Sequence, residues 1–334
     1  MKLKSYVVIC LQVCVLLCTN PVWGKASQKV EIQNALDEAY VKFKGQNPGK
    51  NADYIPALAE VNSKFFGLAL VTTDGQIYTK GDVDQAFSIQ SISKVFTLSL
   101  AMEQKGPQNI LDKIGVNATG LAFNSVTAIE LNKDRSINPL VNAGAMAAVS
   151  LLDGKDKKAK WSSLSSWYNQ FANRNLGVLE NVYKSESESN GHNRAIAELL
   201  VSYERFYGDV SVNLDVYTRQ CSVGVTAKDL AIMASVLANN GTHPISKQRL
   251  MSSKNIKHTL AVMMTAGLYE NSGEWAYQVG LPAKSGVGGG IIAVAPGKFS
   301  IAVFSPRLDE AGNSVRAQQA IGYIAQKLNV NVFQ

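Results

Sequence analysis

Apolar residues in the first eighty positions follow a helical spacing and then an alternating one. Residues 27–45 predict a helix, and the β-rich stretch from Phe65 to Thr72 predicts a strand. Asp74-Gly75 is a strong hairpin signal, so the stretch from Gln76 to Lys80 is expected to return beside that strand. The predicted apolar face of the helix consists of Val30, Ile32, Leu36, Ala39, Tyr40 and Phe43.

The next segment combines a turn, a short extended stretch and a helix. A turn near Gly81-Asp82 leads to the extended stretch from Phe87 to Gln90. A helix is then predicted from about Ser91 to Gln104, because Gly106-Pro107 would end it. Ser91 is therefore expected near a helix N-terminus, where free backbone N–H groups and the helix dipole favour developing negative charge.

Helical spacing continues through most of the chain from about residue 108 to 268. Thr226 to Asp229 is a plausible helix start, and Asn240-Gly241 is a plausible stop. The polar run from Ser185 to Gly191, taken by itself, is typical of a flexible linker. The clearest predicted helices run from Val141 to Leu152, Trp161 to Asn173, Asn193 to Tyr207 and Thr226 to Asn239.

Strand patterns return near the C-terminus, and a closing amphipathic helix is predicted from Ser314 to Leu328. Strands on both sides of a helical insertion favour an α+β fold, with an antiparallel sheet from both chain ends flanked by helices, plus a helical domain. The sheet part is expected to cover about residues 25–107 and 269–334, and the helical part about residues 108–268. The predicted strands are Tyr277 to Val279, Ala283 to Ser285, Gly290 to Ala295 and, after the turn at Pro296-Gly297, Phe299 to Ser305.

Composition and charge describe an ordinary globular protein of 334 residues, with 46% hydrophobic and 18% charged residues. The net charge of +7 includes two lysines in the first 24 residues, which leaves +5 for the rest of the chain. Lysines cluster only at positions 155, 157, 158 and 160, in a segment that resembles a loop. A solvated loop explains this cluster better than a nucleic-acid or membrane patch, so neither partner is expected.

The N-terminus has the three parts of a secretory signal peptide. Lys2 and Lys4 form a charged segment, and an apolar run extends from Val7 to Leu17. Val22 and Gly24 suit the positions three and one before a cleavage site. We expect cleavage of residues 1–24 and a mature protein, residues 25–334, that is periplasmic or secreted without stable membrane association. A retained anchor remains an alternative, and the protein would be cytoplasmic if the leader were not used.

Cysteine and histidine positions bear on disulfide and metal chemistry. Three of the four cysteines lie in the leader, so cleavage would leave Cys221 alone, as a buried structural residue. The histidines lack metal-ligand spacing, and no metal is expected. The glycine-rich run from Gly286 to Gly290 lacks the lysine and helix of a phosphate-binding loop, so no other cofactor is expected. The histidines are His192, His243 and His258.

Two short motifs carry the candidate chemistry. Ser91-Ile92-Ser93-Lys94 is an S-x-x-K motif, and positions three apart share a helix face, which brings the hydroxyl and the amine within hydrogen-bond reach. A serine needs such a base nearby because its alcohol is a weak nucleophile. Lys284-Ser285-Gly286, a K-[ST]-G triplet, follows far downstream in a predicted strand. In penicillin-recognising serine enzymes both motifs line one active site.

Further motifs resemble the serine-dependent glutaminase family, and the resemblance covers roughly residues 30 to 330. It implies hydrolysis of L-glutamine to L-glutamate and ammonia, a serine β-lactamase or transpeptidase-like fold, and a homodimer or homotetramer. The motifs that carry it are Asp53-Tyr54-Ile55-Pro56, Phe87 to Lys94, Asn138-Pro139-Leu140-Val141-Asn142-Ala143-Gly144-Ala145, Arg219-Gln220-Cys221-Ser222 and Gly280 to Val287.

The same resemblance assigns roles to individual residues. It implies that Ser91 is the nucleophile, that Lys94 is its base, and that the backbone N–H groups of Ser91 and Val287 form the oxyanion hole. Lys94 must be neutral to accept a proton, so its pKa must fall well below ~10.4, through burial or a neighbouring cation. Glu186 is expected to pair with the α-ammonium of the substrate. Tyr54, Asn142, Asn193, Tyr217 and Tyr269 are expected around its other polar atoms, and Tyr269 is a candidate proton donor to the leaving ammonia.

Each of these residues also has an ordinary structural interpretation. Asn142 suits a helix cap or a buried amide, Glu188 could be mistaken for Glu186, and any one of the 12 tyrosines could be a core residue. Two other function classes stay open at this point. A non-catalytic amino-acid-binding protein would need no nucleophile. A penicillin-binding protein or β-lactamase needs an S-x-N or Y-x-N element, and the formal matches are Ser136-Ile137-Asn138, Ser211-Val212-Asn213 and Tyr269-Glu270-Asn271.

Overall fold

A computed structural model describes residues 22–334 of the chain. Most of the predicted signal peptide therefore lies outside the described residues, and the expected cleavage site after Gly24 falls within the first turns of helix α1 (Val22–Phe43). Within the described part of the chain, no helix combines the length and the apolar character that a membrane span requires.

The architectural centre is a five-stranded antiparallel sheet with the strand order β2-β1-β7-β6-β5. Its middle is built from both ends of the chain, because β1 pairs with β7 along its whole length, from Gly67 opposite Phe304 to Thr72 opposite Phe299. This confirms the predicted sheet. The strands are β1 (Gly67–Thr72), β2 (Ile77–Gly81), β5 (Ala283–Gly286), β6 (Gly290–Ala295) and β7 (Phe299–Phe304).

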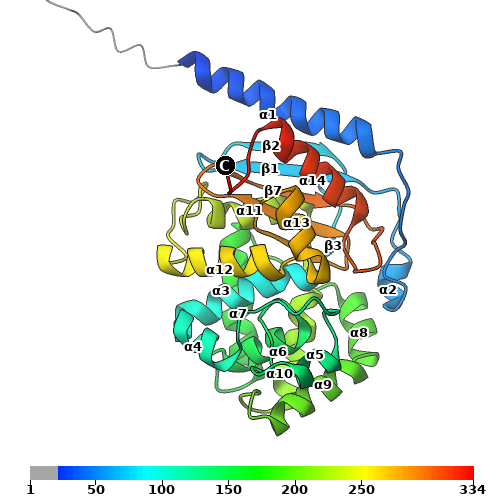
Figure 1. The fold of residues 1–334 in the computed structure, drawn as a ribbon, viewed down its shortest axis with the longest axis vertical. Coiled ribbons are helices and arrows are strands. Elements are labelled where there is room, and N and C mark those ends of the chain that lie inside the picture. Colours follow the sequence, from blue (N-terminus) through cyan, green and yellow to red (C-terminus); the bar gives the residue numbers. More distant parts are fainter. Residues whose placement is uncertain (1–21) are drawn as a thin grey trace, which may run out of the picture.

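Helices cover both faces of this sheet (Figure 1). Helices α1 and α14 (Val315–Lys327) pack side by side on one face, and α11 (Ala227–Ala238) crosses the other. Successive side chains of β1 therefore point to opposite faces of the sheet. Leu68 and Leu70 join the cluster under α1 and α14, whereas Ala69 and Val71 join the larger cluster beneath α11. Because both faces are buried, the strands are almost continuously apolar.

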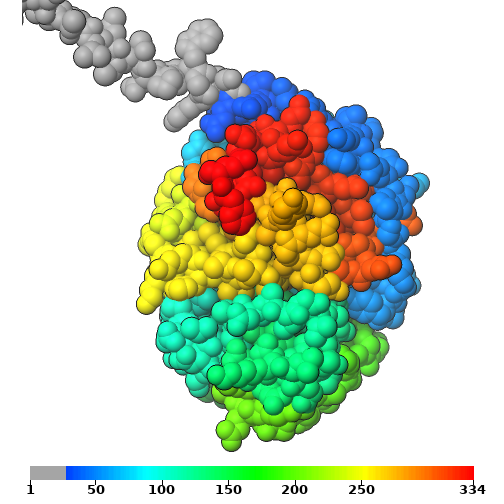
Figure 2. Space-filling view, in the orientation of Figure 1, coloured from blue at the N-terminus to red at the C-terminus, as the bar shows by residue number. Residues whose placement is uncertain are grey.

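Most of the remaining helices form a second layer, at the opposite end of the molecule from the paired chain ends (Figure 2). A short pair of strands, β3 (Phe87–Ser88) and β4 (Gly224–Val225), leads the chain into this layer and out of it. The other helices are α2 (Pro56–Ala59), α3 (Ser93–Lys105), α4 (Pro107–Lys113), α5 (Val126–Leu131), α6 (Asn142–Leu151), α7 (Lys157–Ala172), α8 (Glu180–Glu188), α9 (Gly191–Ser202), α10 (Val210–Cys221), α12 (Ser253–Ala266) and α13 (Ser272–Gln278).

Two segments differ from their sequence predictions. The strand predicted from Tyr277 to Val279 is wrong, because this stretch ends helix α13. The helix buries Trp275, whose indole N–H donates to the carbonyl of Leu281 at 2.7 Å, while Tyr277 remains 90% exposed. The linker predicted from Ser185 to Gly191 is also wrong, because α8 and α9 meet there. In both places tertiary packing overrides the local propensity.

The lysine cluster and one residue of α1 also depart from prediction. Residues 157–160 begin helix α7 rather than a loop, and Lys160 is only 7% exposed. Its amine donates to the carbonyl of Ser150 at 3.0 Å and to Asn213 Oδ1 at 2.7 Å, which stabilises the C-terminal end of α6. In α1, Val30 is 60% exposed instead of lying on the buried face.

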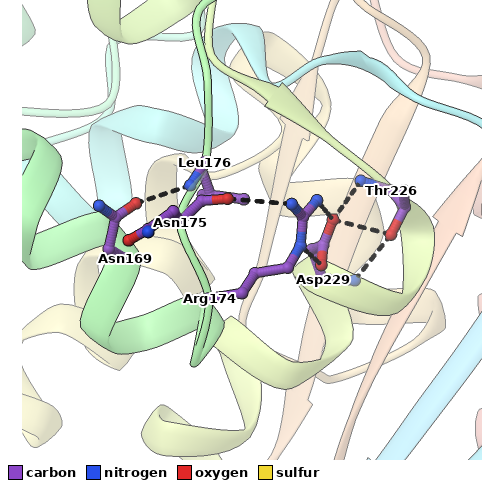
Figure 3. Close-up of polar contacts among 6 residues, drawn as sticks. All are labelled: Asn169, Arg174, Asn175, Leu176, Thr226 and Asp229. Carbon is purple, nitrogen blue, oxygen red and sulfur yellow. Dashed lines mark hydrogen bonds and ion pairs between the residues drawn. The ribbon is translucent and has the colours of Figure 1, made fainter.

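The start of α11 is fixed by its own capping box and by an arginine from the second layer. The Thr226 side chain accepts from the backbone N–H of Asp229, and the Asp229 carboxylate accepts from the backbone N–H of Thr226, as the sequence predicted. Arg174, just after α7, adds two parallel bonds to this carboxylate, at 2.6 and 2.5 Å (Figure 3). One carboxylate therefore both caps α11 and ties α7 to it.

Asp229→Ala is expected to lower the free energy of unfolding by about 2 kcal/mol, since it removes the helix cap and the charged bonds together. Burial alone would raise the pKa of Asp229, but the bonds from Arg174 and Thr226 lower it below its ordinary value. The contribution is therefore complete above the unfolded-state pKa of ~3.9 and is lost as the pH falls below it. Urea unfolding at pH 7 and pH 3 measures both effects.

Asp156→Ala is the matched control for this substitution. Asp156 caps α7 by accepting from the backbone N–H of Ala159, and it forms no ion pair with an arginine among the described residues. Its loss is expected to cost about 1 kcal/mol, the value of a cap alone. Equal costs for the two substitutions would show that the arginine pair contributes nothing.

Candidate active site

The S-x-x-K motif lies at the junction of the sheet and the helical layer. A short 3₁₀ turn over Gln90–Ile92 carries Ser91, and α3 begins directly after it. Gln90 has a φ of +50°, which turns the chain sharply, and the Ser93 hydroxyl donates to the Gln90 carbonyl at 2.6 Å. Ser91 is 6% exposed and Lys94 is 1% exposed, so the predicted helix start is confirmed and both side chains are buried.

Glycines in and just after the second motif let the end of β5 pack directly on this turn. A Cβ on Gly286 would lie 2.9 Å from the Ile89 carbonyl oxygen, and one on Gly288 would lie 2.4 Å from that of Ser88. Side chains at these two positions would push the strands away from the serine. The close approach places Val287, 5% exposed, next to the turn that carries Ser91.

The hydroxyl of Tyr269, a residue that follows helix α12, lies close enough to Ser91 for the two hydroxyls to interact. Tyr269 is 4% exposed and has a φ of +56°, and its hydroxyl donates to the Ser285 carbonyl at 3.2 Å. Burial raises the pKa of Tyr269, so the free site contains a neutral phenol. The serine hydroxyl therefore contacts a group that can take or give a proton.

Lys94 directs its amine to Asn142, the first residue of α6, rather than forming its hydrogen bond with Ser91. The Lys94 Nζ to Asn142 Oδ1 distance is 2.7 Å, and Asn142 Nδ2 in turn donates to Asn193 Oδ1 at 3.0 Å. Burial lowers the pKa of Lys94 to about 8, although the nearby Cys221 and Glu186 oppose the shift. This supplies the lowered pKa that a base at this position requires.

Glu186 points inward from α8, whereas Glu188 is exposed at the end of the same helix. Its Oε1 accepts from Gln90 Nε2 at 2.7 Å, and the hydroxyl of Ser222 lies close enough to influence its pKa. Burial raises the pKa of Glu186 to about 7, while these two residues and the charge of Lys94 act in the opposite direction. Because its hydrogen-bond partners are neutral, the ionised carboxylate can balance the charge of a bound cation.

The remaining predicted site residues lie around these groups. Tyr217, on α10, is 4% exposed and its ring centre is 6.0 Å from the Lys94 amine. Tyr54 is 55% exposed just before α2, close enough to Glu186 and Tyr269 for their charges to interact. The structure thus gathers all the sequence-predicted residues at one place: Tyr54, Ser91, Lys94, Asn142, Glu186, Asn193, Tyr217, Tyr269 and Val287.

Several residues of the site have no signal in the sequence patterns. Gln90 lies within the motif from Phe87 to Lys94, but nothing in its spacing indicates that it holds Glu186. The Phe123 ring packs 4.8 Å from that of Tyr269, and Gly312 lies against Val287 and Phe123. Cys221 is buried as predicted, but it lies beside Lys94, and burial raises its pKa to about 12, so the thiol stays neutral.

The formal S-x-N matches have structural partners instead. The Ser136 hydroxyl donates to the Ile114 carbonyl at 2.8 Å, and Asn138 Nδ2 donates to that of Asn117 at 2.9 Å, so both hold a loop. Asn213 accepts from Lys160, away from Ser91. Between residues 22 and 334, no group of three or more histidine, cysteine or acidic residues is arranged to hold a metal ion.

This arrangement suits nucleophilic attack on an acyl group that belongs to a small zwitterion. A buried serine contacts a neutral tyrosine, a lysine with a lowered pKa follows one helical turn later, and a carboxylate beside neutral donors can bind an ammonium group.

Comparison with known proteins agrees with this geometry. Residues 49–333 match the family described as Glutaminase. The chain is 76% identical over 310 residues to a glutaminase of Colwellia psychrerythraea strain 34H, which covers 93% of this chain and 100% of the relative. It is 50% identical over 302 residues to a glutaminase of Mycobacterium ulcerans strain Agy99, covering 90% of this chain and 94% of that protein.

Solved structures show the same similarity. A probable glutaminase, ybaS, superposes with a TM-score of 0.90 at 48% identity, covering 91% of this chain and 99% of the other. A structure of Mglu in its glutamate form gives a TM-score of 0.85 at 36% identity, covering 90% of this chain and 69% of the other. The α+β architecture with a five-stranded antiparallel sheet is thus shared with solved relatives.

Proposed function

Because this chain belongs to the glutaminase family, we propose that it hydrolyses the side-chain amide of L-glutamine through a γ-glutamyl ester on Ser91. The observation that carries the residue assignment is Lys94, which is fully buried one turn after Ser91 with its pKa lowered to about 8. L-glutamate and ammonia are the products, and the fold is of the serine β-lactamase and transpeptidase type.

Acylation begins with attack of Ser91 Oγ on the δ-carbon of glutamine. The serine proton passes to the neutral amine of Lys94, and the new oxyanion lies between the backbone N–H groups of Ser91 and Val287. Such preorganised donors contribute about 3–4 kcal/mol each to stabilising the transition state. Asn142 keeps the Lys94 amine in place through their 2.7 Å hydrogen bond.

Collapse of the tetrahedral intermediate breaks the C–N bond, and the leaving nitrogen needs a proton to depart as ammonia. Tyr269, in contact with Ser91, donates it and becomes a tyrosinate. In deacylation this tyrosinate takes a proton from the attacking water, and the ammonium of Lys94 returns its proton to Ser91 Oγ. Glutamate leaves, and both groups recover their starting protonation states.

The substrate backbone is held by residues on the helical side of the site. Glu186 pairs with the α-ammonium, while Tyr54, Asn142, Asn193 and Tyr217 contact its other polar atoms. Support comes from the carboxylate of Glu186, which is held in place by Gln90 and lies within electrostatic reach of Tyr54.

Glu186→Gln is expected to lower kcat/KM for L-glutamine by about 100-fold, mainly through KM, since the α-ammonium loses its counter-charge. In the wild type, protonation of Glu186 as the pH falls through about 7 removes the same charge, so KM should rise there. The variant should lack that rise. Initial rates of ammonia release between about pH 5.5 and pH 8.5 give the KM of the wild type and of the variant on either side of this transition.

Gln90→Met keeps the carboxylate of Glu186 and tests whether it must be held in position. It removes the 2.7 Å bond to Glu186 and should raise KM for L-glutamine by roughly 10-fold. Glutaramate, which lacks the α-ammonium, is the control substrate, and its KM should change in neither variant. If KM for glutaramate rose as well, Gln90 and Glu186 would instead be needed for the folding of the site.

The reaction itself is tested by incubating the purified full chain with L-glutamine and quantifying ammonia and glutamate, which should appear in equal amounts. L-asparagine and nitrocefin serve as alternative substrates. Nitrocefin hydrolysis without glutamine turnover would favour a penicillin-type enzyme. Calorimetric binding of glutamine without turnover would favour an amino-acid-binding protein.

We further propose that the enzyme is exported and assembles as a homodimer or homotetramer. Export is supported by the pattern of Lys2, Lys4 and the apolar run from Val7 to Leu17. Cell fractionation tests it, and enzyme found only in the cytosol with its leader intact would contradict it. Light scattering on the purified protein tests the assembly, which a monomeric mass would exclude.

A further inference from the structure

Lys284 of the K-S-G motif has no part in the reaction as described, although it is among the largest fully buried side chains of the described residues. It extends from β5 towards the core that contains α3 and Ile292, its partner across the β5–β6 ladder. A lysine buried this completely must have its polar atoms satisfied by the protein.

The groups that the Lys284 amine contacts directly are electron-rich. Nζ donates to the Ser285 carbonyl at 2.6 Å and to the Gly267 carbonyl at 2.9 Å. Gly267 caps the C-terminus of α12, where the helix dipole favours a cation. The Tyr269 ring presents its face to the same amine, 4.1 Å from the ring centre. Two carbonyl oxygens and a π-face form the environment that an ammonium group prefers.

Lys284 and Tyr269 are also coupled through a shared acceptor. The Ser285 carbonyl accepts from the Lys284 amine at 2.6 Å and from the Tyr269 hydroxyl at 3.2 Å. Tyr269 has a left-handed backbone, with a φ of +56°, a strained conformation that persists only where the surrounding structure holds the residue. The amine thus contacts the ring and the carbonyl that orients the hydroxyl, and so fixes the tyrosine beside Ser91.

We propose that Lys284 is a positioning residue that holds Tyr269 against Ser91 and whose ammonium form stabilises the tyrosinate made when Tyr269 protonates the leaving ammonia. The inference rests on the proposed function. No atom is transferred to or from Lys284: the proton moves from Tyr269 to nitrogen as the C–N bond breaks, and returns from water in deacylation.

The charges near both groups affect the protonation state of Lys284 and of Tyr269. Burial, and then the charge of Lys94, lowers the pKa of Lys284 well below its ordinary value. Tyr54, Cys221 and Glu270 each raise the pKa of Tyr269 further when ionised, and Tyr217 also interacts with it. The Lys284 amine lies on the ring face of Tyr269, so the negative charge of a tyrosinate acts against the lowering of the Lys284 pKa and keeps the amine protonated.

The test compares L-glutamine with L-glutamate γ-methyl ester in Lys284→Gln, whose side-chain amide can still donate to both carbonyls. An alkoxide can leave an ester with little help from a proton donor, whereas the nitrogen of an amide must be protonated before it can leave as ammonia. We therefore expect kcat/KM for glutamine to fall roughly 30-fold, equivalent to about 2 kcal/mol, and that for the ester to fall less than about 3-fold. Lys284→Met, which has no hydrogen-bond donor in its side chain, should also lower kcat/KM more for glutamine than for the ester, in a protein that is less stable.

Lys160→Met is the matched control, because Lys160 is another buried lysine that donates to a carbonyl and an amide, but contacts Ser150 and Asn213 instead of the active site. It should lower the melting temperature and leave the ratio of amide to ester hydrolysis unchanged. In a Tyr269→Phe background, Lys284→Gln should have no further effect on that ratio.

Equal losses for amide and ester, or no loss for either, would overturn the role of Lys284. A wild-type chain that releases no ammonia from glutamine would instead refute the proposed function on which it rests. A Lys284→Gln effect on the ratio that persists in Tyr269→Phe would show that the lysine acts through another group, and would also overturn the proposal.

Discussion

Replacing Ser91 by alanine is expected to lower kcat for L-glutamine by at least about 10⁴-fold, since no ester can form without the hydroxyl. The protein should stay folded, because the turn that carries Ser91 is held by the Ser93 bond to the Gln90 carbonyl. Ammonia release, coupled to glutamate dehydrogenase, measures the loss, and circular dichroism confirms the fold.

Ser99→Ala, on the same helix, is the control. Ser99 is fully buried and bonds to the Phe96 carbonyl and the Trp167 indole, so its loss should affect stability more than turnover. Mass spectrometry of acid-quenched reactions should find a γ-glutamyl adduct on the peptide containing Ser91 in the wild type and none in Ser91→Ala. Substantial turnover by Ser91→Ala would remove the serine from the mechanism.

Lys94→Met is expected to lower kcat/KM for L-glutamine by about 10³-fold or more, because it removes the proposed base and keeps the volume of the side chain. In the wild type the base works only when neutral. With a pKa lowered to about 8, Lys94 should make kcat/KM rise with pH up to about 8 and then level off. Rates from pH 6 to pH 10, at intervals of about half a unit, test this.

The control for Lys94→Met is Lys105→Met, which removes an exposed ion pair with Asp153 at the far end of α3 and should leave the rate unchanged. The structure also provides a specific alternative base, because Tyr269 lies next to Ser91 whereas Lys94 bonds to Asn142. If Lys94→Met kept a rate close to that of the wild type, Tyr269 rather than Lys94 would be the base that activates Ser91.

Local rules predicted those parts of the protein that depend on neighbouring residues. The hairpin between β1 and β2 follows from Asp74-Gly75, and the start of α11 follows from the capping box of Thr226 and Asp229. Ser91 and Lys94 lie one turn apart for the same reason. The resemblance to glutaminases then selected Glu186 over Glu188, which residue types alone left open.

Segments whose structure depends on distant partners were predicted less well. Residues 277–279 have strand-like side chains, but Trp275 packs inward and keeps them in α13. The polar run that contains Glu186 has little apolar character, yet Val182, 4% exposed, anchors its helix, and Gln90, 96 positions earlier, binds its carboxylate. Neither partner is visible from the local sequence.

The sequence by itself determined the order of the elements, the S-x-x-K turn and the family, because these depend on short-range sterics and on residue types at fixed spacing. Only the tertiary structure decided that Tyr269 lies next to Ser91, that Lys94 bonds to Asn142, 48 positions away, and that Lys284 lies under the Tyr269 ring. The pairing of β1 with β7 and the burial of the site bring these groups together. Hydrogen-bond partners and pKa values depend on that burial, since the removal of water sets the cost of each charge.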